Sequence, residues 1–216
     1  MVNIKICCIQ SAEEIRLAAG HGVAALGFVS AMPSGPGPIA DARIETLVPL
    51  VPRAVRTFLL TSKPDASAII AQVRRLGVSS VQVCDRLMIG SYRDLRSALP
   101  GVSVVQVIHV QDERSVHEAA AVADEVDELL LDSGRPDAPV KELGGTGRVH
   151  DWKLSRRIRE AVRVPVWLAG GLHAGNVREA VALVRPAGVD VCSGVRTGGV
   201  LDPAKLDAFV RAARTP

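Results

Sequence analysis

Short apolar runs rich in β-branched residues alternate along this chain with segments in which hydrophobic residues recur every three to four positions. The runs predict strands over residues 3–8, 24–29, 53–60, 80–84, 102–110, 128–131, 165–169 and 189–192. The intervening segments predict helices over about residues 11–19, 41–50, 65–76, 91–99, 115–122, 152–162, 176–184 and 203–213. The pattern therefore predicts eight consecutive strand–helix units.

Helix start signals support several of these boundaries. Ser11 is followed three residues later by Glu14, the spacing of a capping box. Asp65 stands before another predicted helix, and Pro203 occupies the first-turn position that proline favours. These residues indicate where the first, third and last helices begin.

Strict alternation of strand and helix produces parallel strands with right-handed crossovers, and eight such units can close into a (β/α)8 barrel. A doubly wound open sheet is the alternative architecture. However, the segment after the first strand, Cys7-Cys8-Ile9-Gln10, lacks the glycines of a dinucleotide-binding turn. No segment resembles a linker, so we expect an α/β chain with one barrel domain over residues 1–216.

Composition narrows the class of partner. Only 3% of residues are aromatic and the formal charge of +3 is spread along the chain, which disfavours nucleic acid as a partner. No apolar run reaches the roughly 18 residues of a membrane span, and Lys5 and Gln10 interrupt the first apolar run. We therefore expect a cytoplasmic protein with no membrane partner. The oligomeric state cannot be inferred from these patterns.

Four cysteines lack the paired spacing of a zinc site or of a secreted disulfide framework: Cys7, Cys8, Cys84 and Cys192. Buried, reduced thiols are the expectation for most of them. Carboxylates and histidines at the predicted strand ends are also too few to suggest a divalent metal. The sequence predicts no metal and no cofactor.

Candidate chemistry lies where barrel active sites form, at the carboxyl ends of the strands. Cys7 ends the first strand and Asp132 follows the sixth, which makes a thiol and an acid available for proton transfer. Lys5 lies two residues before Cys7 on the same strand face, and a nearby ammonium group favours the thiolate. The simpler interpretations are that Cys7 is a small packing residue and that Asp132 is a loop or capping carboxylate.

Two glycine-containing pairs, Gly170-Gly171 and Ser193-Gly194, follow the seventh and eighth strands. Glycines let backbone N–H groups approach an anion, and the corresponding loops of such barrels frequently bind phosphate. A phosphorylated small molecule is therefore the expected substrate class.

The chain resembles the phosphoribosylanthranilate isomerase family in a series of motifs that follow one another in order from residue 3 to about residue 210. They are Lys5-Ile6-Cys7, residues 25–29 (ALGFV), Leu130-Leu131-Asp132-Ser133, residues 144–147 (GGTG) followed by Asp151-Trp152, residues 168–172 (LAGGL) with Asn176-Val177, residues 184–186 (VRP), and residues 188–195 (GVDVCSGV). The GGTG stretch before Asp-Trp is the most specific of these.

The resemblance implies a (β/α)8 enzyme that carries out an Amadori rearrangement of an N-(5-phosphoribosyl)amine without cofactor or metal. It implies that Asp132 is the general acid, Cys7 the general base and Asp190 a carboxylate near the ribose hydroxyls. The implied set of substrate-contacting and phosphate-contacting residues is Lys5, Gln82, Gly145, Gly170, Gly171, Asp190, Ser193, Gly194 and Arg196.

Departures from the family pattern fall on the side of the amine. Residues 32–38 (MPSGPGP) contain no cation, whereas the family usually has an arginine in this loop that meets the anthranilate carboxylate. The fourth strand ends in Gln82-Val83-Cys84-Asp85 instead of Gln-Leu-His-Gly, Cys8 replaces a glycine, and Arg196 replaces a frequent glutamate. Arg196 or Arg135 is a candidate replacement for the missing arginine.

Three functions remain compatible with the sequence. The first is the tryptophan-pathway isomerase itself, and the second is a specialised relative that acts on a different aminated ribose phosphate. The third is a catalytically silent barrel that binds a phosphosugar or a partner protein.

Overall fold

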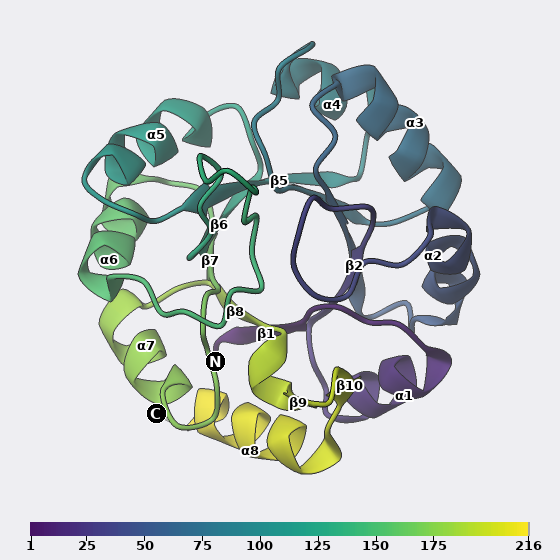
Figure 1. The fold of residues 1–216 in the computed structure, drawn as a ribbon, viewed down its shortest axis with the longest axis vertical. Coiled ribbons are helices and arrows are strands. Elements are labelled where there is room, and N and C mark those ends of the chain that lie inside the picture. The colour runs from purple at the N-terminus through teal and green to yellow at the C-terminus, as the bar shows by residue number, and fades with distance from the viewer. Residues whose placement is uncertain (216) are drawn as a thin grey trace.

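Eight parallel strands close into a barrel in the computed structural model, which describes residues 1–215 (Figure 1). The strands are β1 (Asn3–Ile6), β2 (Ala25–Val29), β3 (Arg56–Thr61), β4 (Ser80–Val83), β5 (Ser103–His109), β6 (Glu128–Asp132), β7 (Val166–Leu168) and β8 (Gly188–Val191). Each strand pairs with the next along the chain, and β8 pairs with β1 to complete the ring. The predicted (β/α)8 barrel is confirmed.

Within residues 1–215, eight α-helices surround the barrel (Figure 1). They are α1 (Ala12–Gly20), α2 (Asp41–Leu47), α3 (Ala66–Leu76), α4 (Tyr92–Ala98), α5 (Arg114–Ala123), α6 (Trp152–Ala161), α7 (Val177–Val184) and α8 (Pro203–Arg214). Each follows the strand of the same number, as the alternating pattern predicts.

Helix α3 shows how the local sequence sets these boundaries. The Asp65 carboxylate accepts hydrogen bonds from the backbone N–H groups of Ser67 and Ala68, which caps the amino end. Gly77 ends the helix in the left-handed conformation, with φ of 65°. Because Ile69 and Val73 lie one turn apart, both are buried on the face that packs against the barrel.

The structure differs most from the predicted elements in three places, and other boundaries shift by one or two residues. Strand β3 begins at Arg56 rather than residue 53, because a turn closed by the Val55 N–H and the Pro52 carbonyl precedes it. Helix α2 ends at Leu47 and continues as a 3₁₀ turn, η1 (Val48–Leu50), which contains Pro49. After β8, the turn η2 (Ser193–Val195) leads into a small hairpin of β9 (Arg196–Thr197) and β10 (Val200–Leu201), which the sequence pattern did not predict.

The interior of the barrel is closed at one end by packed side chains. Phe58 and Trp167 make an edge-to-face contact with ring centroids 5.7 Å apart, and Val105 and Leu130 are buried in the same cluster. The Lys5 ammonium lies 5.0 Å from the centroid of the Phe58 ring. This layer is the floor beneath the site, so a ligand can enter only from the end where the strands finish.

Candidate active site

A cavity lies at the carboxyl ends of the strands. The loops that follow β2 and β6 extend over this end of the barrel (Figure 1). The predicted site residues that line the cavity are Cys7, Gln82, Asp132, Gly145, Gly170, Gly171, Asp190 and Ser193. Lys5, Gly194 and Arg196 are not among the lining residues. The barrel therefore brings most of the predicted site residues to one cavity, and the three exceptions have other contacts.

Asp132 is the last residue of β6 and its carboxyl group is buried at the cavity. Its Oδ1 accepts a hydrogen bond of 2.7 Å from the Ser133 backbone N–H. Burial raises the pKa of Asp132, although that hydrogen bond and the nearby His109 and Lys5 act in the opposite direction. Gly144 of the loop after β6 lies so close that a Cβ there would be 2.6 Å from Oδ2. The site thus shifts the equilibrium of Asp132 toward its protonated form.

Cys7 directly follows β1, and its backbone N–H donates to the Val191 carbonyl at 2.9 Å. Its side chain is 5% exposed and lines the cavity. Gly27 of β2 makes room for it, because a Cβ at that position would lie 3.1 Å from Sγ. Strands β7 and β8 separate β1 from β6 in the ring, so the thiol and the acid reach the cavity from different sides.

Below Cys7, the Lys5 ammonium is fully buried and makes two hydrogen bonds. It donates to Asp190 Oδ2 at 2.8 Å and to Gln82 Oε1 at 2.9 Å. Burial opposes the charge, but the adjacent Asp190 outweighs it and the pKa of Lys5 is raised. Asp190 Oδ1 is buried without a partner in the described chain and can accept a ligand hydroxyl. Lys5 therefore orients Asp190 and Gln82 from below the cavity.

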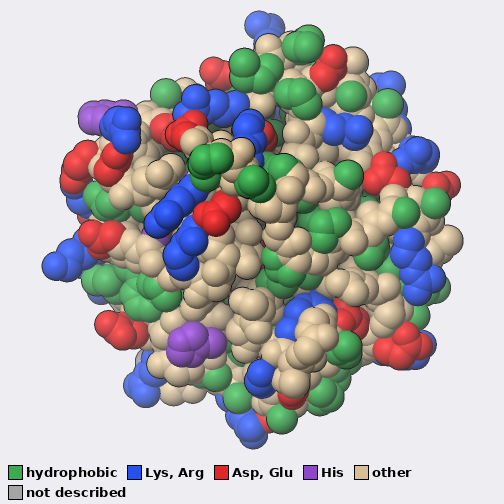
Figure 2. Space-filling model, viewed as in Figure 1, with side chains coloured by type: hydrophobic (Ala, Val, Ile, Leu, Met, Phe, Trp, Pro, Cys, Tyr) green, Lys and Arg blue, Asp and Glu red, His purple; other side chains and the backbone are tan. Residues whose placement is uncertain are grey.

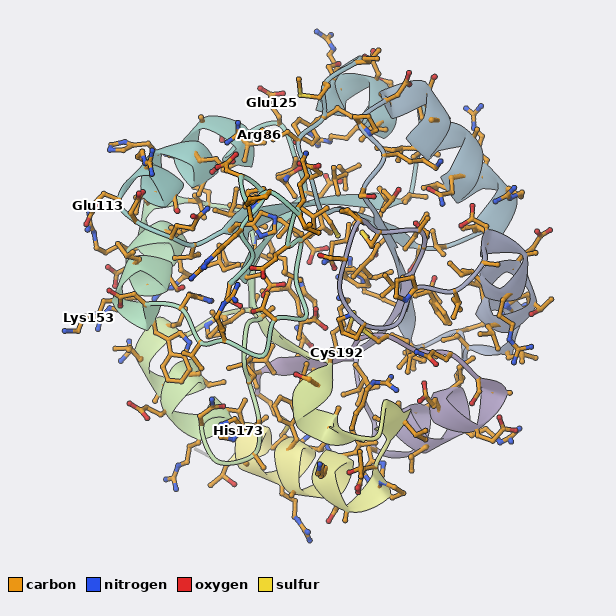
Figure 3. All side chains as sticks on the ribbon, viewed as in Figure 1. Arg86, Glu113, Glu125, Lys153, His173 and Cys192 are labelled. Atoms are coloured by element: carbon orange, nitrogen blue, oxygen red, sulfur yellow. The ribbon has the colours of Figure 1, made fainter. Side chains whose placement is uncertain are left out.

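The other three cysteines also line the cavity. Cys8 has a left-handed backbone with φ of 64°, an uncommon conformation for a residue with a Cβ and one that suits the glycine it replaces. The Cys8 thiol donates a hydrogen bond to the Pro36 carbonyl at 3.6 Å. The neighbouring Cys8 thiol lowers the pKa of Cys192, and burial raises the pKa of Cys84. In Figure 3, Cys192 lies near the centre of the barrel mouth.

The structure does not place Arg196 where it could meet a substrate carboxylate, which corrects the expectation from the sequence. The Arg196 guanidinium is buried and donates to Glu14 Oε1 at 2.6 Å. It also donates to the carbonyls of Cys7, at 3.1 Å, and Cys8, at 2.5 Å. Arg196 thus holds the segment that carries the thiol. The other candidate, Arg135, is exposed and does not line the cavity.

Removing the Arg196 guanidinium is expected to lower kcat by about tenfold or more with little change in KM, because misplacing a reacting group slows the chemical step. Glu14 should be changed with it, since a buried charge left alone costs about 3–5 kcal/mol. Steady-state kinetics of the double variant Glu14→Gln/Arg196→Met tests this. Arg196→Lys keeps the positive charge but loses the several N–H donors of the guanidinium, and it should retain more activity than the double variant. A raised KM with unchanged kcat would instead indicate that Arg196 binds substrate.

Two loops cover the cavity and contact each other. Ser34 of the loop after β2 donates through Oγ to the Lys141 carbonyl of the loop after β6 at 2.5 Å. Gly145 has φ of +66°, and a Cβ on it would lie 2.3 Å from Pro36 Cδ. Only glycine fits where these loops meet. The predicted Gly145 therefore has a clear structural role as well as a place on the cavity wall.

The opposite wall is formed by the loops after β7 and β8, and it offers backbone donors. Gly170 and Gly171 have φ of +82° and +63°. Within residues 1–215, the N–H groups of Gly170, Gly171 and Ser193 make no hydrogen bond to the protein. Gly194 contributes differently, because a Cβ on it would lie 2.0 Å from the Leu172 carbonyl oxygen. Gly194 thus lets the two loops pack closely, and the other three residues can bind an anion.

Two features of the described residues bear on the predicted partners. Among residues 1–215, no three His, Cys, Asp or Glu side chains are grouped so as to hold a metal ion. In the same part of the chain, no helix combines the length and apolar character needed to cross a membrane.

Several lining residues had no assignment from the sequence. For Cys84 and Cys192 the sequence predicts only that they fill the core or form part of the pocket wall, whereas Met32, Leu60 and Leu143 give no signal as lining residues. Glu14 was interpreted as a helix-capping residue. Its carboxylate does accept the Gln10 N–H, but it also pairs with Arg196, 182 positions further along the chain.

Comparison with known proteins identifies the family. The model of the N-(5'-phosphoribosyl)anthranilate (PRA) isomerase family matches residues 4–212. N-(5'-phosphoribosyl)anthranilate isomerase 2 of Methanosarcina mazei is 34% identical over 99% of this chain and 94% of its own length. The crystal structure of phosphoribosyl anthranilate isomerase from Thermotoga maritima superimposes with a TM-score of 0.83 and 27% identity, covering 99% of each chain.

A further similar solved structure contains a bound ligand. It is a phosphoribosyl anthranilate isomerase in complex with reduced 1-(o-carboxyphenylamino)-1-deoxyribulose 5-phosphate. It superimposes with a TM-score of 0.80 and 25% identity, again over 99% of each chain. The match of the family model over nearly the whole chain agrees with the closed barrel and with the motifs around Cys7 and Asp132. This chain belongs to the N-(5'-phosphoribosyl)anthranilate isomerase family.

Proposed function

We propose that this protein catalyses the Amadori rearrangement of an N-(5-phosphoribosyl)amine to a 1-amino-1-deoxyribulose 5-phosphate, with the anthranilate adduct as the reference substrate. The observation that carries the proposal is the placement of a buried carboxyl group, that of Asp132, and a thiol, that of Cys7, on one cavity that also has free backbone donors. An aldose–ketose isomerisation needs a proton donor and a proton acceptor on one sugar.

Asp132 acts first in this proposal. Its proton passes to the furanose ring oxygen, the C1–O bond breaks, and the nitrogen lone pair forms an iminium ion at C1. The raised pKa of Asp132 keeps a fraction of the group protonated at a pH where an exposed carboxyl group would be ionised. Gly144 lies directly against the carboxyl group of Asp132 and so limits exchange of its proton with solvent.

Cys7 acts second, as the thiolate that removes the C2 proton. The electrons of the C2–H bond form the C1–C2 double bond and neutralise the iminium nitrogen, which gives an enolamine. Protonation at C1 and loss of the proton from the C2 hydroxyl then give the ketone, so atoms and electrons balance without an oxidant. The buried Lys5 ammonium beneath Cys7 places positive charge where the thiolate forms.

The remaining residues bind the sugar phosphate. Asp190 accepts a ribose hydroxyl through its free Oδ1, and Gln82 is held beside it by Lys5. Phosphate is bound by the free N–H groups of Gly170, Gly171 and Ser193, with no charged side chain required. These steps move only protons, so the proposal assigns no metal or cofactor.

The cytoplasm is the compartment that fits this mechanism, because reduced thiols persist there and a disulfide at Cys7 would remove the base. A silent phosphosugar-binding barrel, the rival function, would need the phosphate site but neither the acid nor the thiol.

Growth complementation separates these functions. A tryptophan auxotroph that lacks this isomerase step is expected to grow when it expresses the chain and to fail when it expresses the double variant Cys7→Ala/Asp132→Asn at equal abundance. Growth with the double variant would contradict the assigned roles, and failure of the wild-type chain at a high expression level would favour either a relative that acts on a different amine or the silent barrel.

A further inference from the structure

The residues that line the cavity include no lysine, arginine or histidine in the part of the chain that the structure describes. The charged residues on its wall are Asp132 and Asp190, both acidic. Lys5, the nearest cation below it, is already bound to Asp190 and Gln82. The cavity therefore has no positive side chain left for a second anionic group on the ligand.

The position of the phosphate decides which wall faces the amine. In the ring of eight strands, β7 and β8, which carry the free N–H groups, lie across from β3 and β4. With the reacting carbons between Cys7 and Asp132, the amine extends toward the loops and strand ends on the far side. That wall is formed by Val29, Met32, Leu60, Cys84 and Leu143, which are apolar or uncharged.

Cations around the mouth have partners or lie elsewhere. Lys141 pairs with Asp85 at 2.5 Å, and Arg148 pairs with Glu142. Figure 2 shows uncharged atoms over the middle of the mouth, with most of the flanking Lys and Arg side chains to its upper left. Arg86 contributes to other hollows of the surface and lies toward α5, away from the centre (Figure 3).

A carboxylate on the amine would enter this cavity at a cost. It would lose water without gaining a cation and would add a negative charge near Asp132 and Asp190. An uncharged ring would instead bury apolar surface against Met32, Leu60 and Leu143. The phosphate does not meet the same difficulty, because its donors are backbone N–H groups on the opposite wall.

We infer that the amine half of the substrate is recognised by shape and apolar contact, so that the enzyme does not select for a carboxylate on the amine and accepts adducts of uncharged amines as well as the adduct of anthranilate. This inference rests on the proposed function and specifies its substrate class. It assigns Met32, Leu60, Cys84 and Leu143 as residues that determine specificity on the amine side.

The test compares kcat/KM for the phosphoribosyl adducts of anthranilate and of 2-aminobenzamide, which has nearly the same shape without the charge. The amide adduct is expected to react as well as the anthranilate adduct or better. A preference for the anthranilate adduct of more than tenfold would overturn the inference.

Binding of unreactive analogues separates this inference from the proposed chemistry. Calorimetry would compare the reduced product analogue that carries the carboxylate with the matching carboxamide. If both bind with no preference for the carboxylate but neither adduct is turned over, the proposed function fails while the inference about the cavity stands. A preference of more than tenfold for the carboxylate analogue would overturn the inference whatever the turnover.

A variant that adds a cation on the amine side provides an independent test of the inference. Ser34 lines the cavity from the loop after β2, so Ser34→Arg would place a guanidinium on the amine side. Because an arginine–carboxylate pair is a strong charge-assisted contact, the ratio of kcat/KM for the anthranilate adduct to that for the amide adduct should rise by about tenfold or more. Ser34→Gln, similar in length but uncharged, should leave the ratio unchanged. An unchanged ratio in Ser34→Arg would indicate that the carboxylate already has a partner and would overturn the inference.

Discussion

Replacing Asp132 with asparagine is expected to lower kcat by about 10²–10⁴-fold while the barrel stays folded, since proton transfer by a positioned group contributes on that order. An amide has nearly the same shape and can still donate a hydrogen bond, but it cannot release a proton to the ring oxygen. Steady-state kinetics measures the effect, and circular dichroism with thermal unfolding serves as the control for the fold.

The pH dependence gives a second view of Asp132. Burial raises the pKa of this acid, and the protonated form is the active one, so kcat/KM should fall as the pH rises through that raised pKa. The residual activity of Asp132→Asn should lack this fall. A variant that keeps wild-type kcat, or that shows the same loss of activity at high pH, would remove Asp132 from the mechanism.

Replacing Cys7 with serine is expected to lower kcat by a similar factor of about 10²–10⁴, because a hydroxyl group is a much weaker proton acceptor than a thiolate at neutral pH. Serine fits the space beside Gly27, where the present Sγ leaves little room, so the floor of the cavity should be unchanged. Kinetics with the same adduct measures the loss.

Cys192 provides the matched control for Cys7. It lines the same cavity and its pKa is lowered, chiefly by the neighbouring Cys8 thiol, which makes it the rival candidate for the base. Cys192→Ser should retain activity within about tenfold of the wild type, since no proton transfer is assigned to it. Near-normal activity in Cys7→Ser together with loss of activity in Cys192→Ser would identify Cys192 as the base.

The architecture could be predicted from the sequence because each unit carries its own local signals. The apolar run 128–131 and the capped helix that follows Asp65 are recognisable without knowledge of distant residues. Closure of the barrel then places Cys7 and Asp132 at the same end, since both follow parallel strands. Alternation of side chains likewise puts Lys5 on the face of β1 that also bears Cys7.

The sequence was less informative where the function of a residue depends on a contact far along the chain. Arg196 looked like a free cation near the amine, but its guanidinium is bound by Glu14 and by the carbonyls of Cys7 and Cys8. The hairpin that presents Arg196 has strands of only two residues, too short for a periodic pattern to show. No local signal could have revealed either feature.

The residues of the apolar cavity wall could not be recognised from the sequence for a related reason. Leu143 stands in a glycine-rich loop with no periodicity, and Leu60 looks like any other core residue of β3. Their contact with the cavity depends on how the loops after β2 and β6 meet, which Ser34 and Gly145 fix through contacts between the two loops. The sequence shows that residues 32–38 contain no cation. It does not show that a cation near the mouth, such as Lys141, is already paired with a carboxylate.

In the proposed mechanism, one cavity converts an aminoaldose to an aminoketose by proton transfer from Asp132 and to Cys7. This conversion can be followed directly by ¹³C NMR of a phosphoribosyl arylamine labelled at C2 of the ribose, incubated with the wild-type protein and with Cys7→Ala/Asp132→Asn. We expect the alcohol signal of C2 to be replaced by a ketone signal with the wild type only. The absence of a ketone signal with wild-type protein, or its appearance at an equal rate with the double variant, would rule out this mechanism.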